Sequence, residues 1–128
     1  MQYAKHFTLE EARTELLNVI SIVEEIVRLK AELDRKGYDV HRHQYFGGMG
    51  PNGQKVFPTD MEQLVLHVRD LNGRGIEIKD LDKGLIDFPA LRANGEEVYL
   101  CYMLGEKSIL AWHPIEGGFA ARKPITEL

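Results

Sequence analysis

Two histidines, His41 and His43, bracket Arg42 just after a long helical pattern. In an extended segment, residues two positions apart point to the same side, so both imidazoles could bind one divalent transition-metal ion. Two ligands do not complete a site, and the further donors available are His67, Asp87, Glu106 and His113. A metal held here would activate water, with Glu106 or an aspartate as base, which predicts a hydrolase. The simpler interpretation, which we favour, is a solvated loop whose histidines titrate ordinarily.

Three carboxylates, Asp80, Asp82 and Asp87, lie close together in the sequence. Asp82-Lys83-Gly84 is typical of a turn in which aspartate accepts hydrogen bonds from backbone amides. Asp87 differs because it interrupts an apolar run, where a carboxylate without a partner would be costly. His113 or Arg122 could pair with it. The sequence does not decide whether such a group is a structural network or an acid/base pair.

A third set of residues accompanies the last predicted strand. Tyr102 and Trp112 could form the walls of a small pocket in which Arg122 binds an anion and His113 exchanges a proton. The alternative is that the segment after this strand simply docks on the sheet through Phe119. The candidate ligand-binding residues are therefore Asp80, Asp82, Asp87, Tyr102, Glu106, Trp112, His113 and Arg122. No catalytic residue is assigned, and the choice between an enzyme and a binding protein stays open.

Other motifs and the composition exclude several classes. Gly48-Met49-Gly50-Pro51-Asn52-Gly53 satisfies GxGxxG, but no helix pattern follows it and Pro51 lacks an amide donor, so it is interpreted as a flexible loop. Cys101 is alone, which excludes an intrachain disulfide and favours a reducing, cytoplasmic setting; among apolar neighbours it is expected to be an inert buried thiol. A net charge of −4 argues against nucleic acid as a partner, and no segment is apolar enough for a membrane helix.

Two helices are expected to precede the sheet. Thr8 and Glu11 form a capping box that opens a helix over about 9–36, roughly 42 Å long, which exceeds the width of a compact domain of this size. Part of it should project or pair, and packing within one domain and homodimer formation are equally favoured. After a loop over about 37–59, a second capping box at Thr59 and Glu62 opens a helix over about 60–73. The two apolar stripes predict an antiparallel hairpin.

The remainder, about 76–128, shows strand patterns separated by turn signals. Alternation begins after Gly75, and Asn94-Gly95 leads into Val98–Leu104, which is apolar on both faces and should therefore be the central strand. We expect an antiparallel sheet of three or four strands. Residues 1–128 thus form a single α+β domain with the helical hairpin first and the sheet second.

The segments KDLDKGLIDFPAL, EEVYLCYMLGE and LAWHPIEGGFAARKPI, together with FTLEEA near the start, resemble the uncharacterised bacterial family known as domain of unknown function 2203. The resemblance runs from Phe7 through the first helix and again from Ile76 to Ile125. It implies paired helices and a small sheet in a cytoplasmic bacterial protein, and it supplies no activity. The matched polar positions are Asp80, Asp82, Asp87, Glu106, His113 and Arg122.

Three functions remain after this reading. The wide apolar stripe and the doubly apolar strand favour a small interaction or regulatory module that forms a homodimer. The first alternative is a metal-dependent hydrolase that uses His41 and His43 with carboxylates. The second is a pocket for a small anionic ligand at Arg122 and His113.

Overall fold

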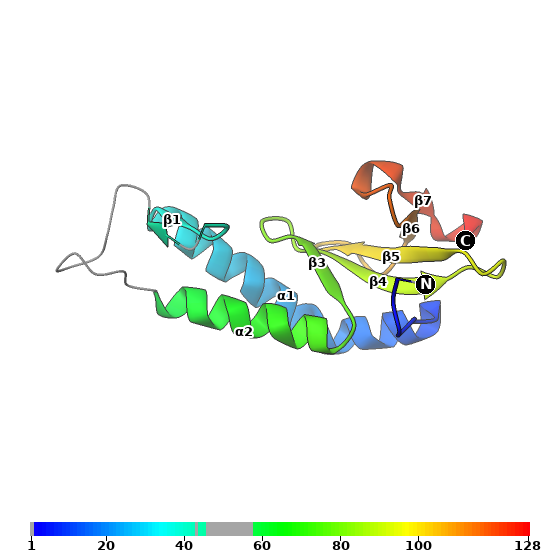
Figure 1. The fold of residues 1–128 in the computed structure, drawn as a ribbon, viewed down its shortest axis with the longest axis horizontal. Helices are drawn as coiled ribbons and strands as arrows, with labels where there is room; N and C mark the ends of the chain where they lie inside the picture. The colour runs from blue at the N-terminus through cyan, green and yellow to red at the C-terminus, as the bar shows by residue number, and fades with distance from the viewer. Residues whose placement is uncertain (1, 43, 46–57) are drawn as a thin grey trace.

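The computed structural model describes residues 2–42, 44–45 and 58–128. A helical hairpin forms one end of the molecule and an antiparallel sheet the other (Figure 1). The chain runs through α1 (Leu9–Arg35), β1 (Tyr38–Asp39), β2 (Gln44–Tyr45), α2 (Thr59–Gly73), β3 (Glu77–Asp80), β4 (Leu85–Leu91), β5 (Glu97–Met103), β6 (Ala111–Pro114), η2 (Phe119–Ala121), β7 (Lys123–Pro124) and η3 (Ile125–Glu127). The α+β architecture expected from the sequence is confirmed.

The first helix begins as its capping box predicts. The Thr8 side chain accepts a hydrogen bond from the amide of Glu11, and the Glu11 carboxylate accepts one from the amide of Thr8. Ion pairs tie each end of α1 to the opposite end of α2, with Lys36 Nζ 2.7 Å from Asp60 and Arg74 Nη1 3.3 Å from Glu15. The predicted antiparallel hairpin is therefore confirmed. Its far end extends beyond the sheet (Figure 1).

The capping box predicted at Thr59 and Glu62 is wrong. Pro58 occupies the cap position of α2 in an extended conformation, and no side chain caps this end. Because the fixed ring of Pro58 presets the chain for helix entry, Thr59 is already the first helical residue and its hydroxyl lies too late to serve as the cap. The predicted end at Gly73 agrees with the structure.

The sheet has five strands in the order β3-β4-β5-β6-β7, where the sequence predicted three or four. The additional strand, β7, is two residues long and pairs with β6 through the registers Ala111↔Pro124 and Trp112↔Lys123. Such a short strand containing Pro124 has no alternating pattern to reveal it, and proline is tolerated there because β7 lies at the edge. As predicted, β5 is the central strand.

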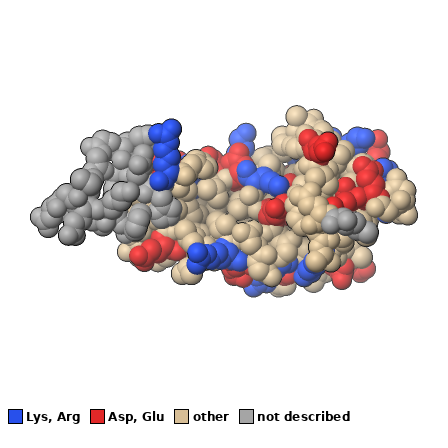
Figure 2. Space-filling view, viewed as in Figure 1, with Lys and Arg blue, Asp and Glu red and all other residues tan. Residues whose placement is uncertain are grey.

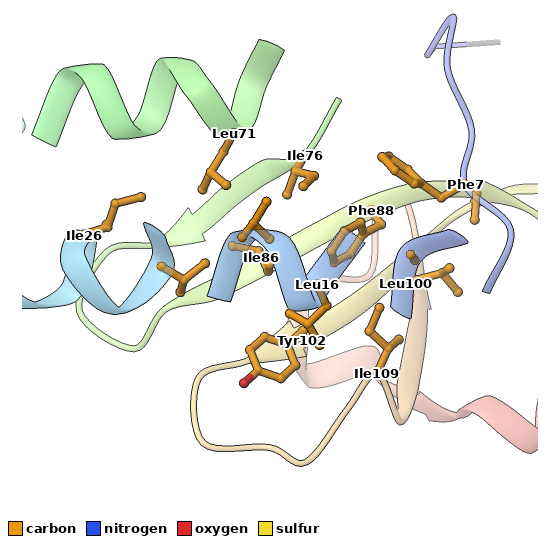
Figure 3. Packing of buried hydrophobic residues seen from close by; sticks show 14 of the residues in the cluster. Phe7, Leu16, Ile26, Leu71, Ile76, Ile86, Phe88, Leu100, Tyr102 and Ile109 are labelled. Atoms are coloured by element: carbon orange, nitrogen blue, oxygen red, sulfur yellow. The ribbon is translucent and has the colours of Figure 1, made fainter. Parts of the chain in front are cut away.

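One face of the sheet packs on the helices. Phe88, Leu100 and Tyr102 point toward Leu16 of α1 (Figure 3). Because successive residues of a strand point to opposite faces, the residues between these core positions face away from the helices. This second face carries the polar groups of the candidate site.

Two further properties concern the distribution of charge and the ability to span a membrane. Lys and Arg are interspersed with Asp and Glu on the face displayed in Figure 2. Within the described part of the chain, neither helix combines the length and apolar character that crossing a membrane requires.

Candidate functional site

Three neighbouring strands bring Asp87, Cys101 and His113 together on the sheet face that points away from the helices. Asp87 of β4 lies opposite Cys101 of β5, while His113 of β6 lies opposite Tyr99, two residues along the same strand. The three residues are almost inaccessible, with 1%, 0% and 2% of their surface exposed. The cluster is thus a buried polar group, and Glu77 of β3 lies opposite Asp87 on its other side.

The two nitrogens of His113 have different partners. Nδ1 lies 2.7 Å from the carbonyl oxygen of Pro114, which can only accept, so Nδ1 carries a proton. Nε2 lies 3.0 Å from Oδ2 of Asp87. Burial by itself would lower the pKa of His113, but the hydrogen bond and charge of Asp87 outweigh it, so the pKa is raised above its usual value. The pair therefore favours imidazolium beside carboxylate.

The third member, Cys101, lies close to both. One donor atom from each of Asp87, Cys101 and His113 lies within 4.8 Å of the other two. Burial, with the nearby negative charge of Asp87, raises the pKa of the Cys101 thiol. Cys101 is therefore a protonated thiol and a poor nucleophile near neutral pH. The predicted burial of this thiol is confirmed.

One oxygen of the cluster lacks a partner. Oδ1 of Asp87 is buried and has no hydrogen-bond partner among the residues that the structure describes. A buried carboxylate oxygen without a donor or cation carries an uncompensated desolvation cost. The neighbouring donor is the Cys101 thiol, whose interaction with Asp87 contributes to the rise in the thiol pKa. The cluster therefore offers three metal-ligating side chains, including a carboxylate oxygen that makes no hydrogen bond of ordinary geometry.

An ion pair covers one side of the cluster. Nη2 of Arg122 donates to both carboxylate oxygens of Glu106, at 2.8 and 3.0 Å, and Glu106 also accepts from the amide of Met103 at 2.6 Å. The positive charge of Arg122 opposes the rise in the pKa of Cys101. The two side chains remain 17% and 20% exposed, so they form the rim between the cluster and solvent.

A second set of polar residues, centred on Glu77, covers the other side of the cluster. The ring of Tyr99 packs on His113 with centroids 5.3 Å apart. Glu77 accepts hydrogen bonds from the hydroxyls of Tyr99, at 2.7 Å, and of Tyr3, and its carboxylate lies 3.0 Å from Lys79. Although burial by itself would raise the pKa of Glu77, these donors lower it. The N-terminal segment thereby closes this edge of the site.

The structure separates other predicted site residues from this cluster. Tyr102 and Trp112 belong to the core on the helix side of the sheet, so they cannot wall a pocket with His113. Asp80 accepts the amides of Asp82 and Lys83 in a turn. Asp82 itself lies 2.8 Å from Lys30.

The histidines after α1 lie elsewhere. His41 is exposed and follows β1, which lies at the end of the hairpin away from β6 (Figure 1). No set of three potential metal ligands within the described ranges includes it. His43 and the glycine-rich segment 48–53 lie outside the described residues, so the proposed use of His41 and His43 stays a prediction.

A family model described as an uncharacterized conserved protein family, DUF2203, matches residues 5–125. The chain belongs to the DUF2203 family. In this DUF2203 chain, the match spans every residue of the Asp87, Cys101 and His113 cluster and its Arg122 and Glu106 rim. Comparison with curated proteins gave no match, and neither did comparison with solved structures.

Sequence reasoning identified two members of the cluster in this DUF2203 protein and missed the third. Asp87 was expected to need a partner, and His113 was one of the two named. Cys101 was considered only as an apolar residue. Its place opposite Asp87 depends on the register of β4 and β5, which no local pattern in the sequence indicates.

Proposed function

We propose that this DUF2203 protein binds one divalent transition-metal ion at a centre made by Asp87, Cys101 and His113. The observation that carries the proposal is the convergence of three different donor types within 4.8 Å of one another in a buried position. In a tetrahedral zinc site, donor atoms lie about 3.3–3.8 Å apart, so side-chain rotations suffice to bring this set onto an ion. The unpartnered Oδ1 of Asp87 supplies a ready first contact.

The orientation of His113 supports the same function. A metal-ligating histidine commonly donates its second ring N–H to a backbone carbonyl or carboxylate, which fixes the tautomer and the ring. Nδ1 of His113 already makes such a bond to Pro114, and Nε2 points at Asp87. The imidazole is therefore held in the orientation that ligation through Nε2 requires.

The net charge of the centre is close to zero both without and with a bound metal ion. Without an ion, imidazolium and carboxylate neutralise each other and the thiol is neutral. With a divalent ion, the Asp87 carboxylate and the Cys101 thiolate contribute two negative charges, while His113 becomes neutral. Because both arrangements are close to electroneutral, the buried centre tolerates loading and release of the ion.

The donor set also selects the class of ion. Thiolate and imidazole favour zinc and related late transition metals over magnesium or calcium, which prefer oxygen ligands. The ligand thiol has to be reduced, which agrees with the cytoplasmic setting expected from the single cysteine. We therefore propose zinc as the resident ion and Co²⁺ as its spectroscopic substitute.

The decisive experiment is a titration of untagged protein with Co²⁺, followed by displacement with Zn²⁺. Wild-type protein should bind one equivalent and develop a thiolate-to-cobalt charge-transfer band, accompanied by a raised melting temperature. Cys101→Ser should lose the band, because a hydroxyl remains protonated and is a poor ligand, while keeping the volume of the site. His113→Gln should likewise weaken the binding of Co²⁺.

His41→Ala is the matched control, since it removes a histidine that lies away from the cluster. It should bind the metal like the wild type. Metal binding that disappears in His41→Ala/His43→Ala but survives in Cys101→Ser would instead favour the hydrolase site after α1. Absence of stoichiometric metal in every form would leave Asp87 and His113 as a structural pair and refute the proposed function.

A second candidate function is self-association through the outer face of α1. Leu17 is 77% exposed and lines a groove of about 510 Å³ with Leu9, Glu10, Arg13 and Thr14. Arg13 lies one turn from Glu10, and its Nη2 donates to the carbonyl oxygen of Ile109 at 2.8 Å, which holds the guanidinium beside the groove. Two copies related by a twofold axis could therefore set each Glu10 against the partner's Arg13 around their leucines. The proposed occupant of this groove is a second copy of the chain.

Light scattering at low micromolar concentration tests this second candidate. The wild type should have the mass of a dimer, and Leu17→Glu should reduce it to that of a monomer. Leu66→Glu is the control, since Leu66 is 63% exposed on the other helix. A strictly monomeric wild type would exclude the dimer.

A further inference from the structure

Arg122 carries a second buried group that lacks a partner, beside the proposed metal centre. Its Nη2 is fully used by Glu106, but its Nε is buried and has no hydrogen-bond partner in the part of the chain that the structure describes. A guanidinium N–H can only donate, so this atom requires an acceptor. The centre therefore contains two unsatisfied atoms of opposite character, Nε of Arg122 and Oδ1 of Asp87.

The sheet register places these groups on one face. β6 and β7 pair through Ala111↔Pro124 and Trp112↔Lys123. Arg122 directly precedes Lys123, just outside the paired residues, and its backbone is extended (φ −59°, ψ 138°). Lys123 shares the face of its partner Trp112, over whose ring it packs, and successive residues of an extended chain point to opposite sides. Arg122 is therefore turned toward the outer face, which carries His113 and Cys101. Its influence on the pKa of Cys101 is consistent with that placement.

Charge repulsion between a metal ion in the proposed centre and the Arg122 guanidinium requires a negative group between them. A divalent ion and Arg122 repel each other in a poorly solvated site unless negative charge separates them. Glu106 pairs with Nη2 of Arg122 and makes no hydrogen bond to Nε. Three protein ligands also leave the fourth position of a tetrahedral ion open.

Resting on the metal centre proposed above, we infer that the site takes a small oxyanion, one oxygen of which binds the open metal position while another accepts a hydrogen bond from Nε of Arg122. The chemical class is a tetrahedral or planar oxyanion such as a phosphate or carboxylate group. This ligand would satisfy both unpartnered atoms together, since the metal compensates Oδ1 of Asp87 and the anion compensates Nε. The partly exposed ion pair of Arg122 and Glu106 is the side from which the ligand enters.

The test uses inorganic phosphate, with acetate as a parallel arm, added to Co²⁺-loaded full-length protein and to the metal-free protein. Wild-type loaded protein should bind one equivalent of phosphate or acetate with a change in the visible cobalt spectrum, and metal-free protein should bind neither. Preference between the two probes distinguishes a phosphate group from a carboxylate as the natural ligand group. Arg122→Lys keeps a cation for Glu106 but loses the directed Nε–H, so it should weaken anion binding about tenfold.

Lys123→Gln is the matched control, because Lys123 is exposed, adjacent in sequence and packs over Trp112 on the helix side. It should bind both metal and anion like the wild type. Metal binding without any anion effect would overturn this inference alone and indicate that one water bridges Nε and Oδ1. Equal anion binding by wild type and Arg122→Lys, or binding to metal-free protein, would overturn it as well. Failure of Co²⁺ to bind would refute the metal centre, and this inference with it.

Discussion

His113 and Asp87 meet across a strand that lies between them. Nε2 of His113 is 3.0 Å from Oδ2 of Asp87, although their strands, β6 and β4, are both paired with β5 and not with each other. Two strand spacings amount to roughly 10 Å, so both side chains must lean inward over β5. Cys101 lies on β5 beside this contact, which explains why its thiol is completely buried.

Removal of Asp87 should strongly destabilise the metal-free protein. Asp87→Ala leaves His113 buried without its partner, and breaking a buried ion pair on one side costs about 3–5 kcal/mol. Urea unfolding measures the loss. The double variant Asp87→Leu/His113→Leu should recover most of it, because it removes both polar groups. A free energy of unfolding for Asp87→Ala equal to that of the wild type would contradict the observed pairing.

Metal affinity should increase with pH. Binding requires Cys101 to become a thiolate, and burial has raised the pKa of its thiol, so each binding event displaces at least one proton. The apparent association constant should rise about tenfold per pH unit for each proton displaced. Competitive Co²⁺ titrations across neutral pH, in a buffer that does not bind metal, measure the slope. An affinity independent of pH would show that the thiol is not a ligand.

Glu77 should make the protein sensitive to acid. Because its folded-state pKa is lowered, the stability it contributes is present above its unfolded pKa of 4.5 and is lost as the pH falls through the lower folded value. Glu77→Gln should flatten the stability profile in this acid range, as measured by thermal melts. Glu116→Gln, at an exposed position, should leave the profile unchanged. Identical profiles for Glu77→Gln and the wild type would disprove this role.

Two glycines in left-handed conformations should differ in their tolerance of a methyl group. At Gly84 (φ +65°), an added Cβ would lie 2.8 Å from Cβ of Leu104 and 3.0 Å from Val23, whereas at Gly95 (φ +88°) nothing lies within 4 Å. Gly95→Ala should cost about 1–2 kcal/mol from backbone strain alone. Gly84→Ala should cost a further 1–3 kcal/mol, roughly, from overpacking. If chemical unfolding gave the same loss of unfolding free energy for both variants, the contact of the added methyl group with Leu104 and Val23 would have to relax freely.

Local patterns predicted the helices and the central strand well. The capping box at Thr8, the apolar stripe of α1 and the doubly apolar β5 each depend on residues near in sequence, where spacing alone specifies conformation. The cap of α2 failed because one preceding residue, Pro58, outweighed the side-chain signal.

The candidate site depended on information that local patterns lack. The sequence indicated that Asp87 needs a partner, but the register that sets Asp87 beside Cys101 is fixed by how three strands align. Trp112 and His113 are adjacent residues of one strand, so alternation by itself sets them on opposite faces, and the structure places Tyr102 and Trp112 in the core on the helix side.

The origin of the three donors in three successive strands has a consequence for biosynthesis. A nascent chain that has emerged only through β5 already presents Asp87 and Cys101, yet His113 follows 26 residues after Asp87 and the covering Arg122 comes later still. At that stage the growing polypeptide presents only two of the three ligands, which would bind a metal ion weakly. If the proposed metal centre forms, the ion is therefore selected only after translation has passed the last strands, when the completed sheet sets the positions of all three ligands.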